Sequence, residues 1–143
     1  MHSNDEHEEK RPPQESDKSL RGFDSEERPW GTWTVLAEGV GYKVKLIEVR
    51  PGHRLSLQFH HYRSEHWVVV SGRGRAIIDT KVLELYPGES VVVPLRSVHR
   101  LENPWSDSLK IVEVQRGEIL SEEDIVRLED DYQRADARVT GDE

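Results

Sequence analysis

Short apolar or alternating segments, separated by turn residues, run through the middle of this chain from Arg28 to Gln115. Alternation over a few residues is typical of a half-buried strand, and glycine, proline and asparagine mark the turns between strands. Turn signals occur at Pro51-Gly52, Gly72, Gly74, Pro87-Gly88 and Asn103-Pro104. Nine strands are predicted, at 32–36, 42–49, 54–60, 65–71, 74–79, 81–85, 90–93, 99–102 and 109–115. So many short strands at this spacing predict a jelly roll or a barrel.

A different pattern follows the last predicted strand. Ser121 can cap a helix with Asp124 as its reciprocal partner, and Ile125, Leu128 and Tyr132 fall on one helical stripe. The sequence therefore predicts an all-β domain that ends in a short C-terminal helix.

The two ends of the chain are too polar to contribute to a core. Residues 1–24 are almost all charged or polar and contain a proline pair, so they cannot bury enough apolar surface to offset the entropy of ordering. We expect a disordered N-terminal tail over 1–24, one folded domain over 25–134 and a disordered C-terminal tail over 135–143. A total length of 143 residues fits one domain of this kind.

Composition excludes several classes of function. The formal net charge is −8 and no basic run occurs, which argues against a nucleic-acid partner. Cysteine is absent, so a metal must be held by histidine, carboxylate or amide groups. No apolar stretch approaches the roughly 18 residues that span a bilayer, and the N-terminus carries no hydrophobic signal core. These features predict a cytoplasmic protein with no membrane partner.

Four polar residues have the spacing of a metal site. Gln58 and His60 lie two apart on a predicted strand and so share a face, Glu65 begins the next strand, and His99 begins a later one. One amide oxygen, two imidazoles and one carboxylate suit zinc, manganese, iron, cobalt or nickel and leave coordination positions open. Taken singly, each histidine can equally be exposed or hydrogen-bonded, and Glu65 can be an ordinary ion-pair partner.

Three other histidines compete for the ligand role. His61 and His66 have the opposite strand parity to His60 and Glu65, so we expect them to face outward or sideways. His53 lies at a turn, where a structural or exposed role is favoured.

These segments resemble the two sequence motifs of the cupins. The first motif corresponds to Gly52, Gln58-Phe59-His60, Glu65 and Gly72, and the second to Gly88, Pro94, His99 and Asn103. Gln58 stands where the motif has its first histidine, and Arg96 stands where it has a glycine after the proline. The resemblance implies the cupin double-stranded β-helix, a jelly-roll barrel.

More specifically, the chain resembles the type II mannose-6-phosphate isomerase cupin over about residues 28–134. The segments that carry this likeness are RPWGTWTVL, GYKVKLIEV, PGHRLSLQFHHYRSEHWVVVSG, VPLRSVHRLENP and IVEVQRGEILSEEDIVRLEDDYQR. In that family the cupin is commonly the C-terminal part of a bifunctional protein that also carries mannose-1-phosphate guanylyltransferase.

The resemblance implies a metal-dependent aldose–ketose isomerase that interconverts mannose 6-phosphate and fructose 6-phosphate in polysaccharide precursor metabolism. It implies one divalent ion held by Gln58, His60, Glu65 and His99. Zinc is the first choice, because Gln-x-His with a later Glu and His resembles the zinc set of the type I isomerases; manganese, cobalt, nickel or iron are alternatives.

Cationic and amide side chains near these motifs are candidates for the reaction and for substrate binding. Lys45 and Arg63 are the candidate catalytic residues, for proton transfer and for stabilising the enediolate, and Lys43, Arg100 and Asn103 are candidates for binding the sugar phosphate. The structural alternatives are an exposed lysine face on one strand and a surface ion pair between Arg100 and Glu102. Cupins often pair through their strand edges, so a homodimer is expected.

Two other functions fit the same residues. One is a noncatalytic sugar-phosphate or nucleotide-sugar binding module that acts beside a separate guanylyltransferase. The other is a different cupin enzyme, such as an iron-dependent oxygenase or a sugar epimerase, although Gln58 in place of histidine disfavours an oxygenase.

Overall fold

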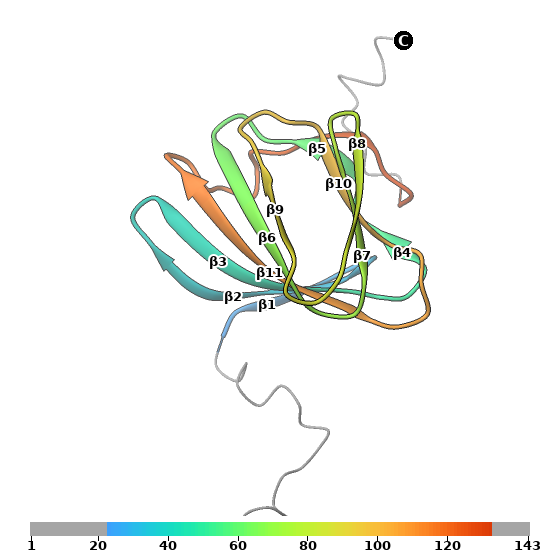
Figure 1. The fold of residues 1–143 in the computed structure, drawn as a ribbon. Helices are drawn as coiled ribbons and strands as arrows, with labels where there is room; N and C mark the ends of the chain where they lie inside the picture. Colours follow the sequence, from blue (N-terminus) through green and yellow to red (C-terminus); the bar gives the residue numbers. More distant parts are fainter. Residues whose placement is uncertain (1–22, 133–143) are drawn as a thin grey trace, which may run out of the picture.

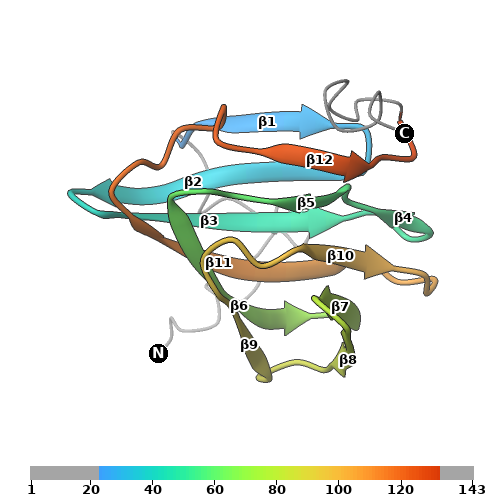
Figure 2. The same ribbon diagram turned by 90° about the horizontal axis from the view of Figure 1, so that it is seen from above.

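The computed structural model describes residues 23–132, which form two antiparallel sheets that face each other (Figures 1 and 2). Residues 1–22 of the predicted N-terminal tail (1–24) and all of the predicted C-terminal tail (135–143) therefore lie outside the described residues, as do residues 133–134 of the predicted domain. The strands are β1 (Ser25–Arg28), β2 (Gly31–Gly39), β3 (Tyr42–Val49), β4 (His53–Arg54), β5 (Leu57–Phe59), β6 (Arg63–Ser71), β7 (Gly74–Ile78), β8 (Lys81–Leu85), β9 (Ser90–Val93), β10 (His99–Asn103), β11 (Leu109–Gly117) and β12 (Val126–Glu129).

Neighbours in each sheet come from distant parts of the chain. The first sheet has the order β1-β2-β3-β11-β6-β9, and the second has β12-β5-β10-β7-β8 with β4 also paired to β10. The chain passes repeatedly from one sheet to the other, which is the jelly-roll topology expected from the sequence (Figure 1).

The interior of the first sheet changes from apolar to charged along its three central strands. Alternate residues of β3, β11 and β6 point inward, as the period of two requires. Paired residues form cross-strand rows, which run, from the apolar end, Ile47, Ile111, Val69; then Lys45, Glu113, Trp67; then Lys43, Gln115, Glu65. One end of the barrel is thus filled by an apolar core, and the other holds polar side chains.

Apolar packing of the core involves both sheets. The buried cluster contains Trp30, Ile47, Val49, Trp67, Val69, Ala76, Ile78, Leu85, Val93, Leu101, Leu109 and Ile111. Burying a side chain of this size contributes about 1.5–3 kcal/mol. The apolar end therefore supplies the rigid frame on which the polar end is held.

Two turn positions show why the motif residues are where they are. Gly72 has φ of 84°, and a Cβ there would lie 2.3 Å from the carbonyl oxygen of Ser108, so only glycine fits. Arg96 also has a positive φ, 64°, at the place where the cupin motif has glycine. The turn keeps the left-handed conformation that the motif requires, although arginine adopts it less readily.

Eight of the nine predicted strands form as single strands, whereas the predicted strand 54–60 is divided into β4 and β5, and β1 and β12 were not predicted. The predicted C-terminal helix is wrong. Ser121 accepts a hydrogen bond from the amide of Glu123 (3.0 Å), and the amide of Asp124 donates to the carbonyl of Ser121, so the capping signal closes an isolated turn. β12 follows and pairs with β5 on the second sheet. Pairing of this segment with the open edge of β5 therefore outweighs the helical pattern of Ile125, Leu128 and Tyr132. Among the described residues no helix is long and apolar enough to cross a membrane.

Candidate metal centre

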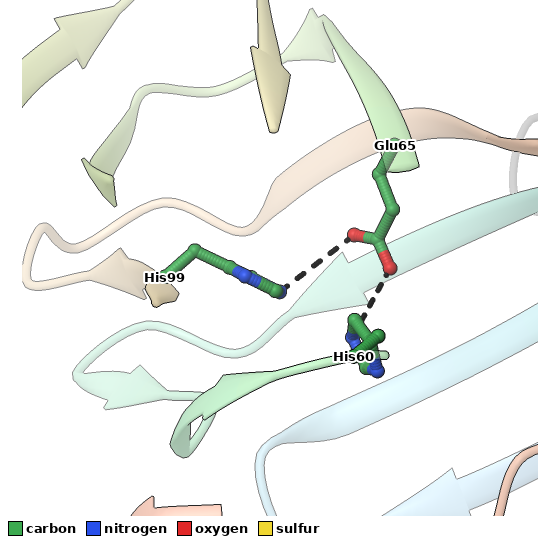
Figure 3. A group of neighbouring side chains, drawn as sticks. All are labelled: His60, Glu65 and His99. Atoms are coloured by element: carbon green, nitrogen blue, oxygen red, sulfur yellow. Dashed lines mark ion pairs between the residues drawn. The ribbon is translucent and has the colours of Figure 1, made fainter. Parts of the chain in front are cut away.

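Three buried side chains from three strands or their ends meet at the polar end of the barrel. Glu65 lies on β6, His99 begins β10, and His60 directly follows β5 (Figure 3). The Nε2 atom of His60 is 3.3 Å from Oε2 of Glu65, and Nε2 of His99 is 3.9 Å from Oε1. The candidate ligand atoms of all three residues lie within 4.8 Å of one another. Such a cluster has the size and the donor chemistry of a divalent metal site.

Both imidazoles are held in the orientation that a metal ligand needs. His60 donates its Nδ1 hydrogen to the backbone carbonyl of Asp124 (2.6 Å), and His99 donates its own to the carbonyl of Ser97 (2.8 Å). These bonds place the hydrogen of each ring on Nδ1, so that the unprotonated Nε2 faces Glu65. Burial, reinforced by Arg63 and His99, lowers the pKa of His60 to about 3, and burial also lowers the pKa of His99. Both rings are therefore neutral near pH 7, as coordination requires.

The carboxylate of Glu65 is fixed from both sides. Arg63 Nε donates to its Oε2 at 3.0 Å, and Trp67 Nε1 donates to its Oε1 at 2.9 Å. Arg63 also donates from Nη2 to Nε2 of His60 at 3.2 Å. The guanidinium thus bonds to the same lone pairs that a metal ion would use, and it supplies the positive charge in this structure.

Gln58, the fourth predicted ligand, lies next to the triad. It is opposite His99 in the pairing of β5 with β10, and its side chain is buried. Its amide nitrogen donates to Oγ of Ser56 (2.8 Å), which orients the carboxamide. Gln58 lines the same cavity as Glu65 and His99. Its role as a ligand stays a prediction.

Glu65 and His99 of the triad line a cavity that also has several charged side chains on its wall. Predicted residues on its wall are Lys45, Gln58, Arg63, Glu65, His99 and Arg100. Lys45 is 3% exposed, lies with its Nζ 4.0 Å from the centroid of the Trp33 ring and pairs with Glu122. Arg100 is also buried, and it donates to the carbonyl of Leu55 and to Glu129. The two structural alternatives, an exposed lysine face and an ion pair between Arg100 and Glu102, are therefore not what the structure shows.

Two predicted substrate-binding residues are placed elsewhere. Lys43 is not on the cavity wall; its Nζ donates to the carbonyl of Leu120 at 3.3 Å. Asn103 is fully buried and closes the turn that follows β10: its amide donates to the carbonyls of Val49 and Asp107, and its oxygen accepts from the amide of Trp105. With these bonds Asn103 serves the fold, and we do not retain it as a substrate contact.

Sequence reasoning missed several polar residues of the cavity, namely Arg28, Glu113, Gln115, Glu122 and Arg127. Glu113 and Gln115 carried a signal, because they have the same strand parity as the core residue Ile111 and must therefore point inward. Burial and the neighbouring Glu65 raise the pKa of Glu113 to about 8. Glu122 lies outside the strands and carried no such signal.

Two buried polar atoms at this site have no hydrogen-bond partner. They are Nη1 of Arg63 and Oε1 of Gln115, both on residues that line the cavity. A donor and an acceptor left unpaired in a buried position each cost free energy, which a polar ligand would recover.

The competing histidines are outside the cluster. His61 and His66 are exposed, as their strand parity predicted. His53, the first residue of β4, is half-buried, and its Nδ1 is 2.6 Å from the hydroxyl of Tyr132.

Comparison with known proteins places these features in context. The family model described as mannose-6-phosphate isomerase C-terminal matches residues 15–130. The alginate biosynthesis protein AlgA of Pseudomonas aeruginosa is 50% identical over 107 residues, which is 75% of this chain and 22% of that protein. Mannose-1-phosphate guanylyltransferase ManC of Salmonella typhimurium is 48% identical over 75% of this chain and 22% of its own length. The chain therefore spans about a fifth of the length of these curated relatives.

Solved structures with the same arrangement of strands belong to several different proteins. A cupin-2 domain from Rhodospirillum rubrum superposes with a TM-score of 0.62 at 23% identity, covering 73% of this chain and 79% of that one. Oxalate decarboxylase of Lactobacillus farciminis superposes with a TM-score of 0.65 at 18% identity, covering 74% of this chain and 33% of that one. At these identities the likeness concerns the fold.

Proposed function

Because this chain belongs to the mannose-6-phosphate isomerase C-terminal family and has the cupin double-stranded β-helix fold, we propose that it is a metal-dependent isomerase of mannose 6-phosphate and fructose 6-phosphate. The observation that carries the proposal is the buried group of His60, Glu65 and His99, two members of which line a cavity that also contains Lys45, Arg63 and Arg100. Polysaccharide precursor metabolism is the proposed setting, since one relative is an alginate biosynthesis protein.

The residues present fit one divalent ion. His60 and His99 offer neutral imidazole nitrogens, Glu65 offers a carboxylate, and Gln58 offers an amide oxygen beside them. Zinc is our first choice for this set, with manganese, cobalt, nickel or iron as alternatives. A bound ion would act as a Lewis acid at the sugar oxygens, where negative charge develops.

The isomerisation moves a proton between C1 and C2 of the sugar, so the protein must supply a group that transfers it. Lys45 is our candidate, because its ammonium group is buried in the cavity wall next to Glu122. Arg63 is the candidate for stabilising the developing enediolate, since its Nη1 is buried and has no partner within the protein. Arg100 is our candidate for binding the phosphate, because it is buried on the cavity wall.

The test is a direct assay. Protein purified without chelators should convert fructose 6-phosphate to mannose 6-phosphate after loading with Zn²⁺, Mn²⁺, Co²⁺, Ni²⁺ or Fe²⁺. A Glu65→Gln variant prepared in the same way should be inactive, which excludes a contaminating isomerase. If the folded wild-type protein converts no fructose 6-phosphate with any of these metals, the proposal is rejected.

A noncatalytic binding module is the second candidate. Two observations favour it: the Salmonella relative is named as a guanylyltransferase, and this chain spans only 22% of that protein. In that case the metal-loaded protein should bind a sugar phosphate or a nucleotide sugar without converting it. Calorimetric titration with fructose 6-phosphate and with a nucleotide sugar, followed by product analysis, distinguishes the two functions.

A further inference from the structure

Glu113 is a buried residue of β11 that the proposed reaction does not use. In the cross-strand pairing of the first sheet it lies between Lys45 on β3 and Trp67 on β6. It is 5% exposed and lies on the wall of the same cavity as Glu65 and His99. A carboxyl group in such a position needs hydrogen-bond partners, because burial without them is costly.

Two side chains of the first sheet donate to Glu113. The amide nitrogen of Gln115 donates to its Oε1 at 2.8 Å, and the indole nitrogen of Trp67 donates to its Oε2 at 3.2 Å. Gln115 is fully buried, so the first bond holds the carboxyl group in one orientation. The second bond then fixes the plane of the Trp67 indole.

Trp67 connects Glu113 to the metal centre. The same Nε1 group also donates to Oε1 of Glu65, at 2.9 Å. The Trp67 ring packs edge-on against the imidazole of His99, with 5.7 Å between the ring centroids and 70° between the ring planes. One indole therefore contacts two of the three candidate ligands, and its own orientation depends on Glu113.

We propose that Glu113 is a positioning residue of the metal centre, which holds the Trp67 indole against Glu65 and His99. The inference rests on the proposed function, because it takes the triad of His60, Glu65 and His99 as the metal ligands. Glu113 itself lies outside that triad, so it acts through Trp67 and not as a ligand. Hydrogen-bonding partners that orient metal ligands typically change metal affinity by about 10–100-fold when they are removed.

The decisive variants are Glu113→Leu and Glu113→Gln. Leucine has a similar volume but accepts no hydrogen bond, so we expect the Zn²⁺ affinity to fall by about 10–100-fold. Glutamine keeps one acceptor oxygen and should cause a smaller fall, of less than about tenfold. If Glu113 only filled space, the two variants would bind Zn²⁺ equally well. Competition with a chelating dye gives the affinity of protein first stripped of metal, and thermal unfolding checks that each variant folds.

A double-mutant cycle with Trp67→Phe shows whether Glu113 acts through the indole. Phenylalanine keeps an aromatic ring but lacks the N–H group. Trp67→Phe alone should weaken Zn²⁺ binding, and Glu113→Leu should then add less than about twofold, because the two residues belong to one hydrogen-bonded chain. Glu102→Gln is the matched control: Glu102 is also a buried glutamate, but its partners are Arg54 and Arg75. It should change the Zn²⁺ affinity less than about twofold.

The outcomes separate this role from the isomerase activity. Equal Zn²⁺ affinity in wild type, Glu113→Leu and Glu113→Gln would overturn the inference even if the wild-type protein isomerises sugars. Additive losses in the double variant would also overturn it, because Glu113 would then act independently of Trp67. Weaker binding by Glu113→Leu than by Glu113→Gln, with a non-additive cycle, would support the inference even if no metal gives turnover.

Two further results are decisive. Should Trp67→Phe fail to fold, the comparison of Glu113→Leu with Glu113→Gln and with the Glu102→Gln control still decides. A folded wild-type protein that binds no Zn²⁺ would overturn the inference and, if the other four metals also fail to bind, the proposed metal centre as well.

Discussion

The two imidazoles of the metal centre are oriented in different ways. His99 donates to a carbonyl only two residues earlier in the chain, whereas His60 donates to the carbonyl of Asp124, 64 residues later. Asp124 belongs to the segment 118–125, called the strap, which joins β11 to β12. The first arrangement is local and forms with β10. The second depends on the docking of the strap, so the geometry of His60 is coupled to a loop that also contacts Lys45.

The histidines offer a direct test of strand parity. His99→Ala should abolish metal binding, because it removes one of three converging ligands, while His66→Ala should leave most of it intact, because His66 is exposed on the outer face. Metal content after dialysis, measured by elemental analysis, is the readout. Equal losses in the two variants would show that the parity assignment is wrong.

Arg63 should oppose metal binding. Its guanidinium bonds to Nε2 of His60 and to Oε2 of Glu65, so a metal ion must displace it. Arg63→Met should therefore tighten metal binding by about tenfold or more, in line with the roughly 1.5–3 kcal/mol typical of hydrogen bonds to charged groups, but lower the rate of isomerisation. Competition with a chelating dye gives the affinity. Weaker binding in a folded Arg63→Met protein would contradict this interpretation.

At the scale of elements, the strap and β12 close the polar end of the barrel. The carboxylate of Asp124 accepts backbone hydrogen bonds from His61 and Tyr62, both at 2.9 Å, in the turn between β5 and β6. These bonds attach the strap to the turn that leads into β6 of the first sheet. At its other end the strap continues into β12, which pairs with β5 of the second sheet. His60 lies in the same turn. The position of this candidate metal ligand therefore depends on how the strap is attached.

Loss of this attachment should cost stability. Asp124→Ala leaves two backbone donors without their acceptor, and we expect the free energy of unfolding to fall by about 1–3 kcal/mol. Urea denaturation followed by circular dichroism measures the change. Glu123→Ala, at the exposed neighbouring position, should stay within about 0.5 kcal/mol of wild type. An equally small effect of Asp124→Ala would show that the attachment is unimportant.

For the whole molecule, three exposed valines lie on two neighbouring strands of the first sheet. Val68 and Val70 on β6 are 37% and 50% exposed, and Val92 on the paired strand β9 is 48% exposed. Contiguous exposed apolar groups commonly mark an interface. The homodimer expected from the sequence stays a prediction, and this face is where we would look for its contacts.

Light scattering after size-exclusion chromatography tests that expectation. The wild-type protein should elute as a dimer, and a Val68→Glu, Val92→Glu double variant should elute as a folded monomer, because two charges would then be buried at the interface. A control pair at exposed sites on β8, Lys81→Glu and Glu84→Lys, should remain dimeric. A monomeric wild type at micromolar concentration would reject this prediction.

The sequence by itself determined the barrel and the inward row of each strand, because alternation with a period of two is a local property of the chain. That is why Glu65, His60 and His99 were identifiable, and why His61 and His66 were expected to be exposed. Only the tertiary structure decided the remainder: that 121–124 closes a turn instead of a helix, that Asn103 serves the fold, and that Glu122 meets Lys45 across 77 residues of chain. The reason is that an unpaired strand edge and a buried charge select their partners by proximity in space, which no local pattern encodes.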